Sequence, residues 1–134
     1  MTDKTKSTAQ SLEQARIAQI FIRARDLERA IAFYRDVLGF KFLFQAPPQM
    51  AFFDCSGVRL LLGVPEKQEF DHPSSIIYFE IADIQSVFQT LKKRGVTFLA
   101  EPHVVHRGEG FELWLAEFND SEDNTLALMS TIAK

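Results

Sequence analysis

A short pattern of residues occurs twice in this chain, and the repeat limits the folds that the chain can adopt. Residues 20–27 read IFIRARDL and residues 77–84 read IYFEIADI, with apolar residues and an aspartate at matching places. Each copy alternates like a strand and then runs into a helical pattern. Because such a unit cannot bury its apolar face alone, the two copies are expected to pack together. The space between them is the first place to look for a functional site.

The residues after each copy predict the same order of elements. In the first half, Asp26 is a candidate helix N-cap, Gly39 ends the helix, and three strands follow. In the second half, Asp83 and Gly95 take the same places. The predicted strands are 17–24, 40–45, 50–55 and 58–64, then 75–82, 96–101, 111–118 and 125–130, with turns at 106–110 and 120–124. This order predicts an α+β fold in which two tandem βαβββ modules form a curved mixed sheet around a cup, with the helices outside.

The composition fits one ordinary globular domain. The chain has 134 residues, of which 46% are hydrophobic, and this is enough for a normal core. We predict a flexible polar segment at residues 1–15 and a single domain at 16–134. Within it, modules 16–65 and 74–131 are joined by a charged linker with a proline at each end.

Charge and hydropathy exclude several classes of partner. No apolar run approaches the roughly 18 residues that a membrane helix needs, and the polar start lacks the apolar stretch of a secretory signal. The net charge of −3 argues against nucleic acid, which requires a clustered basic face. The lone Cys55 has no partner for an internal disulfide and is expected to be a small buried residue. We therefore expect a cytoplasmic protein with neither a membrane nor a nucleic-acid partner.

Strand alternation assigns the side chains of the repeated strands to two faces. Ile20 and Ile22 form the apolar set that the following helix should cover. The alternate residues look toward the concave side, and they are polar or aromatic, as expected for a ligand site. They are Gln19, Phe21 and Arg23 in the first copy, and Ile76, Tyr78 and Glu80 in the second. The alternative is that this face packs against a partner chain or against the other repeat.

Three segments carry a resemblance to a known family. Residues 26–40, DLERAIAFYRDVLGF, resemble the D-L-x-x-(S/A)-x-x-F-Y-x-x-x-L-G-(F/L) signature of the vicinal oxygen chelate superfamily. Residues 91–96 and 118–128 are similar to its L-x-x-x-G-V and F-x-D-P-(D/E)-G-N-x-x-E-L motifs. The family includes glyoxalase I, bleomycin-resistance proteins, fosfomycin-modifying enzymes and ring-cleaving dioxygenases. The resemblance covers about residues 17–130 and implies this fold, a small-molecule site in the cup and a homodimer.

The resemblance also implies where metal enzymes of the family hold their ion. The matching positions in this chain are Gln19, Leu61, Ile76 and Ala127. Only Gln19 offers an oxygen donor, whereas divalent ions need several oxygen or nitrogen ligands. The closing motif also differs, with Ser121 in place of proline and Asp123 in place of glycine. We therefore predict that neither a metal ion nor another cofactor is bound.

Three charged residues are candidates for chemistry in the cup. By comparison with relatives Glu117 faces the cup, and strand alternation adds Arg23 and Glu80. A glutamate in an apolar pocket can have a raised pKa and act as a general base, so Glu117 is the candidate catalytic residue. Alternatively, Arg23 and Glu80, at equivalent positions of the two modules, form a salt bridge. We favour the salt bridge.

A displaced metal site is the second hypothesis. It would use His103 and His106 with Glu112 or Glu117, and would imply a lyase, isomerase or dioxygenase of the glyoxalase type. The two histidines have the spacing of ligands on a helix, but the residues around them predict a strand-to-turn stretch, where that spacing does not bring them together. Surface histidines are the alternative interpretation.

The leading hypothesis is a metal-free protein that binds a small organic molecule, aromatic or cationic, as the sequestering bleomycin-resistance branch does. The residues expected to line its cup are Gln19, Phe21, Arg23, Leu61, Tyr78, Glu80 and Glu117. A third possibility is a cup filled by its own side chains in a protein whose dimer interface is its function. The sequence leaves open which ligand binds, whether it is turned over, and whether one chain or two build each cup.

Overall fold

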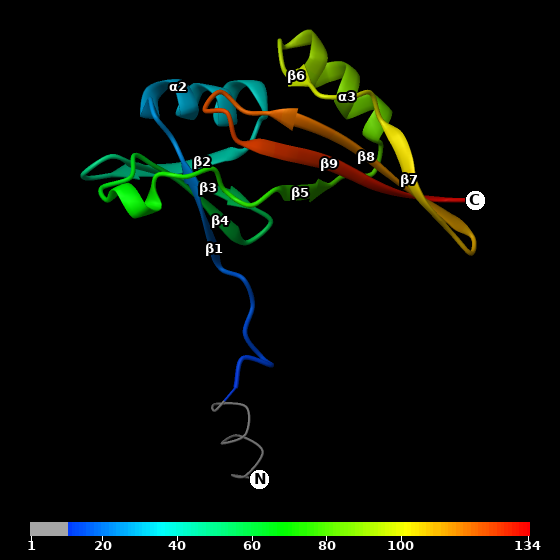
Figure 1. Cartoon of the computed structure of the whole chain (residues 1–134), viewed down its shortest axis with the longest axis horizontal. Coiled ribbons are helices and arrows are strands. Elements are labelled where there is room, and N and C mark those ends of the chain that lie inside the picture. The colour runs from blue at the N-terminus through cyan, green and yellow to red at the C-terminus, as the bar shows by residue number, and fades with distance from the viewer. Residues whose placement is uncertain (1–10) are drawn as a thin grey trace.

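The computed structural model describes residues 11–134, which form two modules of sheet and helix (Figure 1). The first module contains β1 (Gln19–Arg23), α2 (Leu27–Ala32), the π-helical turn η1 (Phe33–Val37), β2 (Lys41–Ala46), β3 (Met50–Cys55) and β4 (Val58–Gly63). The linker contains the short 3-10 turn η2 (Gln68–Phe70). The second module contains β5 (Ile77–Glu80), α3 (Ile84–Lys93), β6 (Thr97–Phe98), β7 (His103–Gly108), β8 (Phe111–Asn119) and β9 (Thr125–Ala133). The predicted α+β fold of two modules is confirmed, and the second module contains one strand more than the predicted βαβββ order. The flexibility predicted for the first residues falls largely on 1–10, outside the described residues.

Both helical segments begin after the predicted N-caps and end near the predicted glycines, although the first changes from α2 to the π-helical η1 after Ala32. The Asp26 side chain accepts a hydrogen bond from the Arg29 backbone N–H at 3.1 Å, and Asp83 accepts one from Ser86 at the same distance. Each aspartate therefore satisfies a free N–H of the first helical turn. Gly39 has a φ of +85°, a conformation that suits glycine and lets the chain leave the helix for β2.

The strands are hydrogen-bonded in two sheets. The first has the order β1-β4-β3-β2, and the second has the order β5-β9-β8-β6, with β7 also pairing with β8. In both sheets the strand that precedes the helix pairs in parallel with the last strand of its module. In Figure 1, α2 lies over the first sheet and α3 lies over the second. Neither α2 nor α3 covers the opposite face of its sheet, although the linker with η2 lies beside that face of the first sheet.

Strand β7 corrects the prediction of a turn at 106–110. His103–Gly108 pair antiparallel with β8, and the turn is limited to Glu109 and Gly110. A register shift between Val104 and His106 interrupts the alternation, so the period-two signal of a strand is missing from the sequence. Conversely, the strand predicted at 96–101 is reduced to the two residues of β6.

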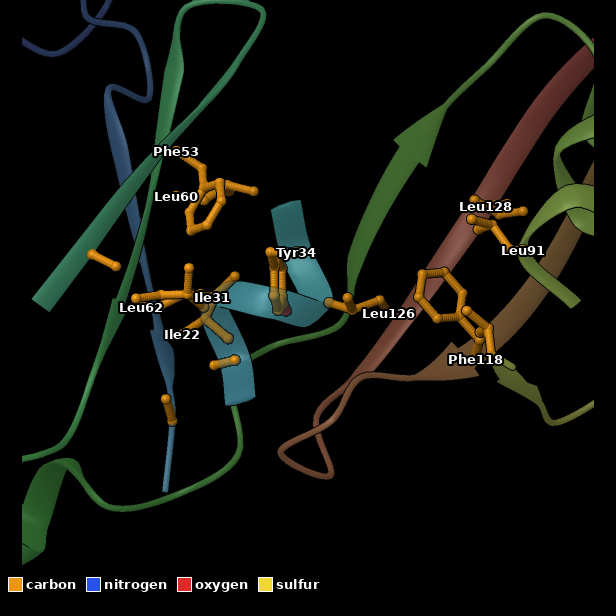
Figure 2. Packing of buried hydrophobic residues seen from close by; sticks show 14 of the residues in the cluster. Ile22, Ile31, Tyr34, Phe53, Leu60, Leu62, Leu91, Phe118, Leu126 and Leu128 are labelled. Carbon is orange, nitrogen blue, oxygen red and sulfur yellow. The ribbon is translucent and has the colours of Figure 1, made fainter. Parts of the chain in front are cut away.

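One apolar core joins the two modules. Ile22, Leu60 and Phe53 of the first sheet pack with Ile31 and Tyr34 of the first helical segment. Figure 2 shows Tyr34 between this group and Leu126, Phe118 and Leu128 of the second module. Because the core is continuous, the modules are expected to unfold together.

A buried carboxylate fastens the turn between β8 and β9 to the start of α2. Glu122 is 1% exposed and accepts hydrogen bonds from the backbone N–H groups of Arg25 and Asp26 at 2.7 and 2.9 Å. The Arg29 guanidinium donates to the same carboxylate at 2.8 and 3.1 Å. Burial acts to raise the pKa of Glu122, but the hydrogen bonds from Arg29, Asp26 and neighbouring groups outweigh it and lower the pKa to about 2.

A second buried carboxylate, that of Asp120, also links the turn between β8 and β9 to the first module. The Tyr34 hydroxyl donates to Asp120 at 2.7 Å, and burial beside this carboxylate raises the pKa of Tyr34 well above its usual range. The backbone N–H and side-chain amide of Asn124 also donate to Asp120, at 2.8 and 2.9 Å. The same amide donates to the Arg23 carbonyl at 2.9 Å, which ties the end of β1 to the turn.

Within the described range, no helix is long and apolar enough to cross a membrane.

Candidate functional site

A row of large apolar side chains crosses the first sheet on the face away from α2. The strand register pairs Phe21 with Leu61, Leu61 with Phe52, and Phe52 with Phe44. The neighbouring positions of alternate parity, Ile22 and Phe53 among them, lie in the core instead. This face, termed the Phe21 face, carries the row together with Gln19, Arg23 and Arg59. Four of the predicted ligand-binding residues therefore share one surface: Gln19, Phe21, Arg23 and Leu61.

Three residues of this face were not predicted from the sequence. The rings of Phe44 and Phe52 stack with their centroids 4.5 Å apart. The Arg59 guanidinium lies 5.4 Å from the Phe52 ring centroid and 5.9 Å from that of Phe44. The two-residue turn after Cys55 could have predicted Phe52, because a tight hairpin at this turn pairs Phe52 with Leu61 on the same face. The face therefore combines aromatic surface with positive charge.

The linker folds back beside this face and borders an open cavity of about 420 Å³. Its walls include Phe21, Met50 and Gly63 from the sheet, and Val64, Lys67 and Phe70 from the linker. A Cβ at Gly63 would lie 2.8 Å from the Phe21 ring, so a larger residue there would require this ring to shift. The sequence marks the linker as a boundary between modules but gives no signal that it returns to the sheet.

The predicted salt bridge between Arg23 and Glu80 is wrong. The Arg23 side chain pairs with Asp71 of the linker, with 3.4 Å between Nη1 and Oδ1. The physical reason is that β1 and β5 belong to separate sheets, while the linker covers the end of β1. Arg23 is buried, with 7% of its surface exposed, whereas Glu80 is exposed.

The other predicted ligand-binding residues lie on the second sheet. The register pairs Tyr78 with Ala127 and Ala127 with Glu117, and it pairs Glu80 with Met129. The face that carries these five residues is termed the Tyr78 face. Tyr78 and Glu80 line a second cavity, of about 440 Å³, with Phe40 and Cys55 of the first module. Phe21 and Tyr78 thus line different cavities.

Cys55, at the end of β3, is half-buried. Burial raises the pKa of its thiol, and the nearby Asp54 carboxylate raises it further.

In this chain, the residues at the strand positions where metal enzymes of the family hold their ion do not fit a metal ion. Gln19 and Leu61 lie on the Phe21 face, Ala127 lies on the Tyr78 face, and Ile76 immediately precedes β5. Three of the four side chains have no oxygen or nitrogen donor, so the set does not provide the coordination that a divalent ion requires. Among residues 11–134, no three His, Cys, Asp or Glu side chains are grouped as a metal site.

The bulge in β7 changes the geometry expected for the histidines. His103 pairs with Leu115 and His106 pairs with Leu113, so both histidines lie on the face of the second sheet that also carries Glu117. They share a face because of the register shift, but they do not form part of a metal-type group within residues 11–134. Both are exposed, and the His103 ring nitrogen Nδ1 lies 2.8 Å from the Glu101 carbonyl oxygen.

Glu112 lies on the opposite face of β8 from these histidines. Arg107 and the Trp114 indole donate hydrogen bonds to it at 3.0 and 3.2 Å, and Lys134 lies 3.6 Å away. Burial acts to raise the pKa of Glu112, but these hydrogen bonds and charges outweigh it and lower the pKa. Glu112 is therefore engaged on the helix side of the sheet and does not join His103 and His106.

Sequence and structure comparisons identify the family. The family model for the Glyoxalase/Bleomycin resistance protein/Dioxygenase superfamily matches residues 16–128, so the chain belongs to this superfamily. A superfamily member from Sphaerobacter thermophilus DSM 20745 has 25% sequence identity and a TM-score of 0.72, covering 87% of this chain and 97% of that chain. Lactoylglutathione lyase from Agrobacterium tumefaciens has 22% identity and a TM-score of 0.64, covering 87% and 93%. A superfamily protein from Alicyclobacillus acidocaldarius has 21% identity and a TM-score of 0.68, covering 90% and 94%.

Proposed function

We propose that this superfamily member binds a small organic molecule against the open faces of its two sheets, without a metal ion. The observation that carries the proposal is the Phe21 face, on which the Phe21 and Phe44 rings are 40% and 44% exposed. Exposed apolar surface rimmed by polar groups is typical of ligand and partner sites. The adjoining cavity of about 420 Å³ has the size of a small-molecule site. The Tyr78 face, which lines the separate cavity of about 440 Å³, is the second surface available to a ligand.

The donor chemistry of the site supports binding rather than metal-assisted turnover. Hydrocarbon side chains at Leu61, Ile76 and Ala127 cannot hold an ion. Affinity would then come from apolar contact and stacking, with orientation supplied by charged groups on the two faces. Glu117 stays a candidate general base if the protein also turns its ligand over.

A neutral aromatic amide, naphthamide, is a suitable first probe. We expect wild-type protein to bind it in a calorimetric titration and Phe21→Ala to lose about tenfold in affinity, because the ring forms both the row and the cavity wall. Tyr78→Ala should lose less. Leu12→Ala, which truncates an exposed residue ahead of β1, is the control and should bind as the wild type does. Equal affinity in the Phe21 variant and the wild type would reject the site.

The metal content separates this proposal from the glyoxalase-type alternative. Tag-free protein, purified without chelators or a nickel column, is expected to contain far less than one metal ion per chain by elemental analysis. EDTA treatment should leave naphthamide binding unchanged. The alternative, a displaced site on His103 and His106, predicts stoichiometric metal that is lost in His103→Ala; that pair of results would replace our proposal with a metal-dependent lyase, isomerase or dioxygenase.

The homodimer that the family resemblance implies stays a proposal. The exposed rings of Phe21, Phe44 and Tyr78 are consistent with a second copy that closes the cup. Light scattering coupled to size exclusion would give the mass. A dimer that dissociates in the Phe21→Ala variant would mean that this ring lies in the interface, whereas an unchanged mass would leave the Phe21 face for the ligand.

A further inference from the structure

The Arg23 guanidinium is buried with incomplete pairing at the edge of the Phe21 face. It is 7% exposed, and its ion pair within residues 11–134 is one 3.4 Å contact with Asp71. The Asp71 side chain is 54% exposed, so it retains much of its contact with water. Burying a guanidinium is unfavourable unless close carboxylates and further hydrogen bonds compensate. One long contact to a half-solvated partner compensates only in part.

Two polar atoms at this place have no hydrogen-bond partner within the described residues. They are Nε of Arg23 and Oγ of Ser74, and both are buried. Asn124 ties the two residues together, because its side chain donates to the Arg23 carbonyl and accepts from the Ser74 backbone N–H. A guanidinium presents its N–H donors as a fork that matches a carboxylate, and here the Nε side of the fork is unused. The site thus lacks an acceptor.

The residues that line the apolar cavity adjoin Arg23 and Asp71 in the strand register and along the chain. Arg23 is the register partner of Gly63, which lines the cavity, and Asp71 directly follows Phe70, which also lines it. One stretch of linker therefore supplies a ring to the cavity and a carboxylate to Arg23. Lys67, with its ammonium group 5.9 Å from the Phe70 ring centroid, adds a positive charge at the rim, beside the negative charge of Glu66.

We propose that the ligand is an aromatic or apolar carboxylic acid whose carboxylate binds Arg23 in place of Asp71. This inference rests on the proposed function and replaces the cationic ligand considered from the sequence. The ring of the ligand occupies the cavity beside Phe21, and its carboxylate uses both sides of the Arg23 fork. Asp71 holds the guanidinium in the free protein and competes with the ligand, so ligand binding releases the linker.

Naphthoate and naphthamide test the proposal because they share a ring and differ in charge. In the wild-type protein we expect naphthoate to bind about tenfold more tightly than naphthamide, the gain typical of a charged hydrogen bond. Asp71→Asn removes the competitor, so naphthoate should bind about fivefold more tightly while naphthamide is unchanged. A purely structural role of the Arg23 and Asp71 pair predicts no such gain.

Variants of Arg23 complete the test. Arg23→Gln should abolish the preference for naphthoate, and Arg23→Lys should restore part of it, because the ammonium keeps the charge without the fork. If Arg23→Gln fails to fold, the Asp71→Asn titration decides alone. Naphthamide binding without a preference for naphthoate would overturn this inference and leave the proposed function intact. Failure of both probes to bind would overturn the proposed function as well.

Discussion

Glu122→Gln is expected to lower the free energy of unfolding by about 2 to 3 kcal/mol. The carboxylate accepts hydrogen bonds from two backbone N–H groups and the Arg29 guanidinium, and an amide can satisfy only part of this set. The lowered pKa, from 4.5 to about 2, indicates a contribution of similar size. Arg29 is half exposed and loses less than a buried cation would. Urea denaturation at neutral pH measures the difference.

The pH dependence gives a second measure of the same contribution. The pKa of Glu122 in the folded protein lies below its ordinary value, so its stabilisation is complete above about pH 4.5 and is lost as pH falls toward 2. Wild-type stability should therefore fall more steeply than that of Glu122→Gln over this range, and the two curves should converge. Asp36 and Glu112 also have lowered pKa values, but both are present in both proteins and cancel in the comparison.

Asp123→Asn is the matched control in the same turn. Its ion pair with Arg25, at 3.3 Å, is exposed on both sides, so its loss should cost less than about 0.5 kcal/mol. Asn also suits the φ of +66° at this position. If Glu122→Gln were no more destabilising than this control, the turn would not be what fastens the modules together.

Phe53→Ala is expected to destabilise the protein by about 3 to 5 kcal/mol, the range for deleting a buried aromatic ring. Phe53 is fully buried, and its ring centroid lies 5.4 Å from that of Phe42 and 6.0 Å from that of Tyr34. The variant would leave a cavity between the first sheet and α2. Thermal and urea denaturation measure the loss. An unchanged dependence of the unfolding free energy on urea concentration would indicate that the loss comes from native-state packing.

Phe44→Ala is the control on the opposite face of the sheet. Phe44 is 44% exposed, and its loss removes one stacking contact with Phe52, worth about 1 kcal/mol. It should instead weaken ligand binding. Equal destabilisation by the two variants would contradict the strand register, because a slip of one residue exchanges the two faces.

Local sequence signals were sufficient for the modular fold. Asp26 and Asp83 cap their helices because their side chains meet backbone donors three residues away, a distance that the sequence itself defines. Two motifs that are far apart in the sequence are in contact in the structure. The Tyr34 hydroxyl from the first motif donates a hydrogen bond to Asp120 from the closing motif, so these two signature residues have a structural role here.

The candidate site was predicted only in part. Alternation placed Phe21 on the correct face of its strand, because side-chain direction in a strand depends on position alone. The pairing of Arg23 with Asp71 depends on how the linker returns to the sheet, and no local pattern encodes it. The bulge that gathers His103 and His106 on one face is likewise a property of the β7 and β8 ladder.

The most direct test of the central claim is an amide NMR titration of isotope-labelled full-length protein with naphthamide. We predict saturable shift changes at Phe21, Leu61 and Gly63, and at Phe70 across the cavity, with smaller changes at Tyr78. Changes confined to the cavity between the modules, around Phe40 and Cys55, or the absence of any saturable change, would contradict ligand binding at the Phe21 face.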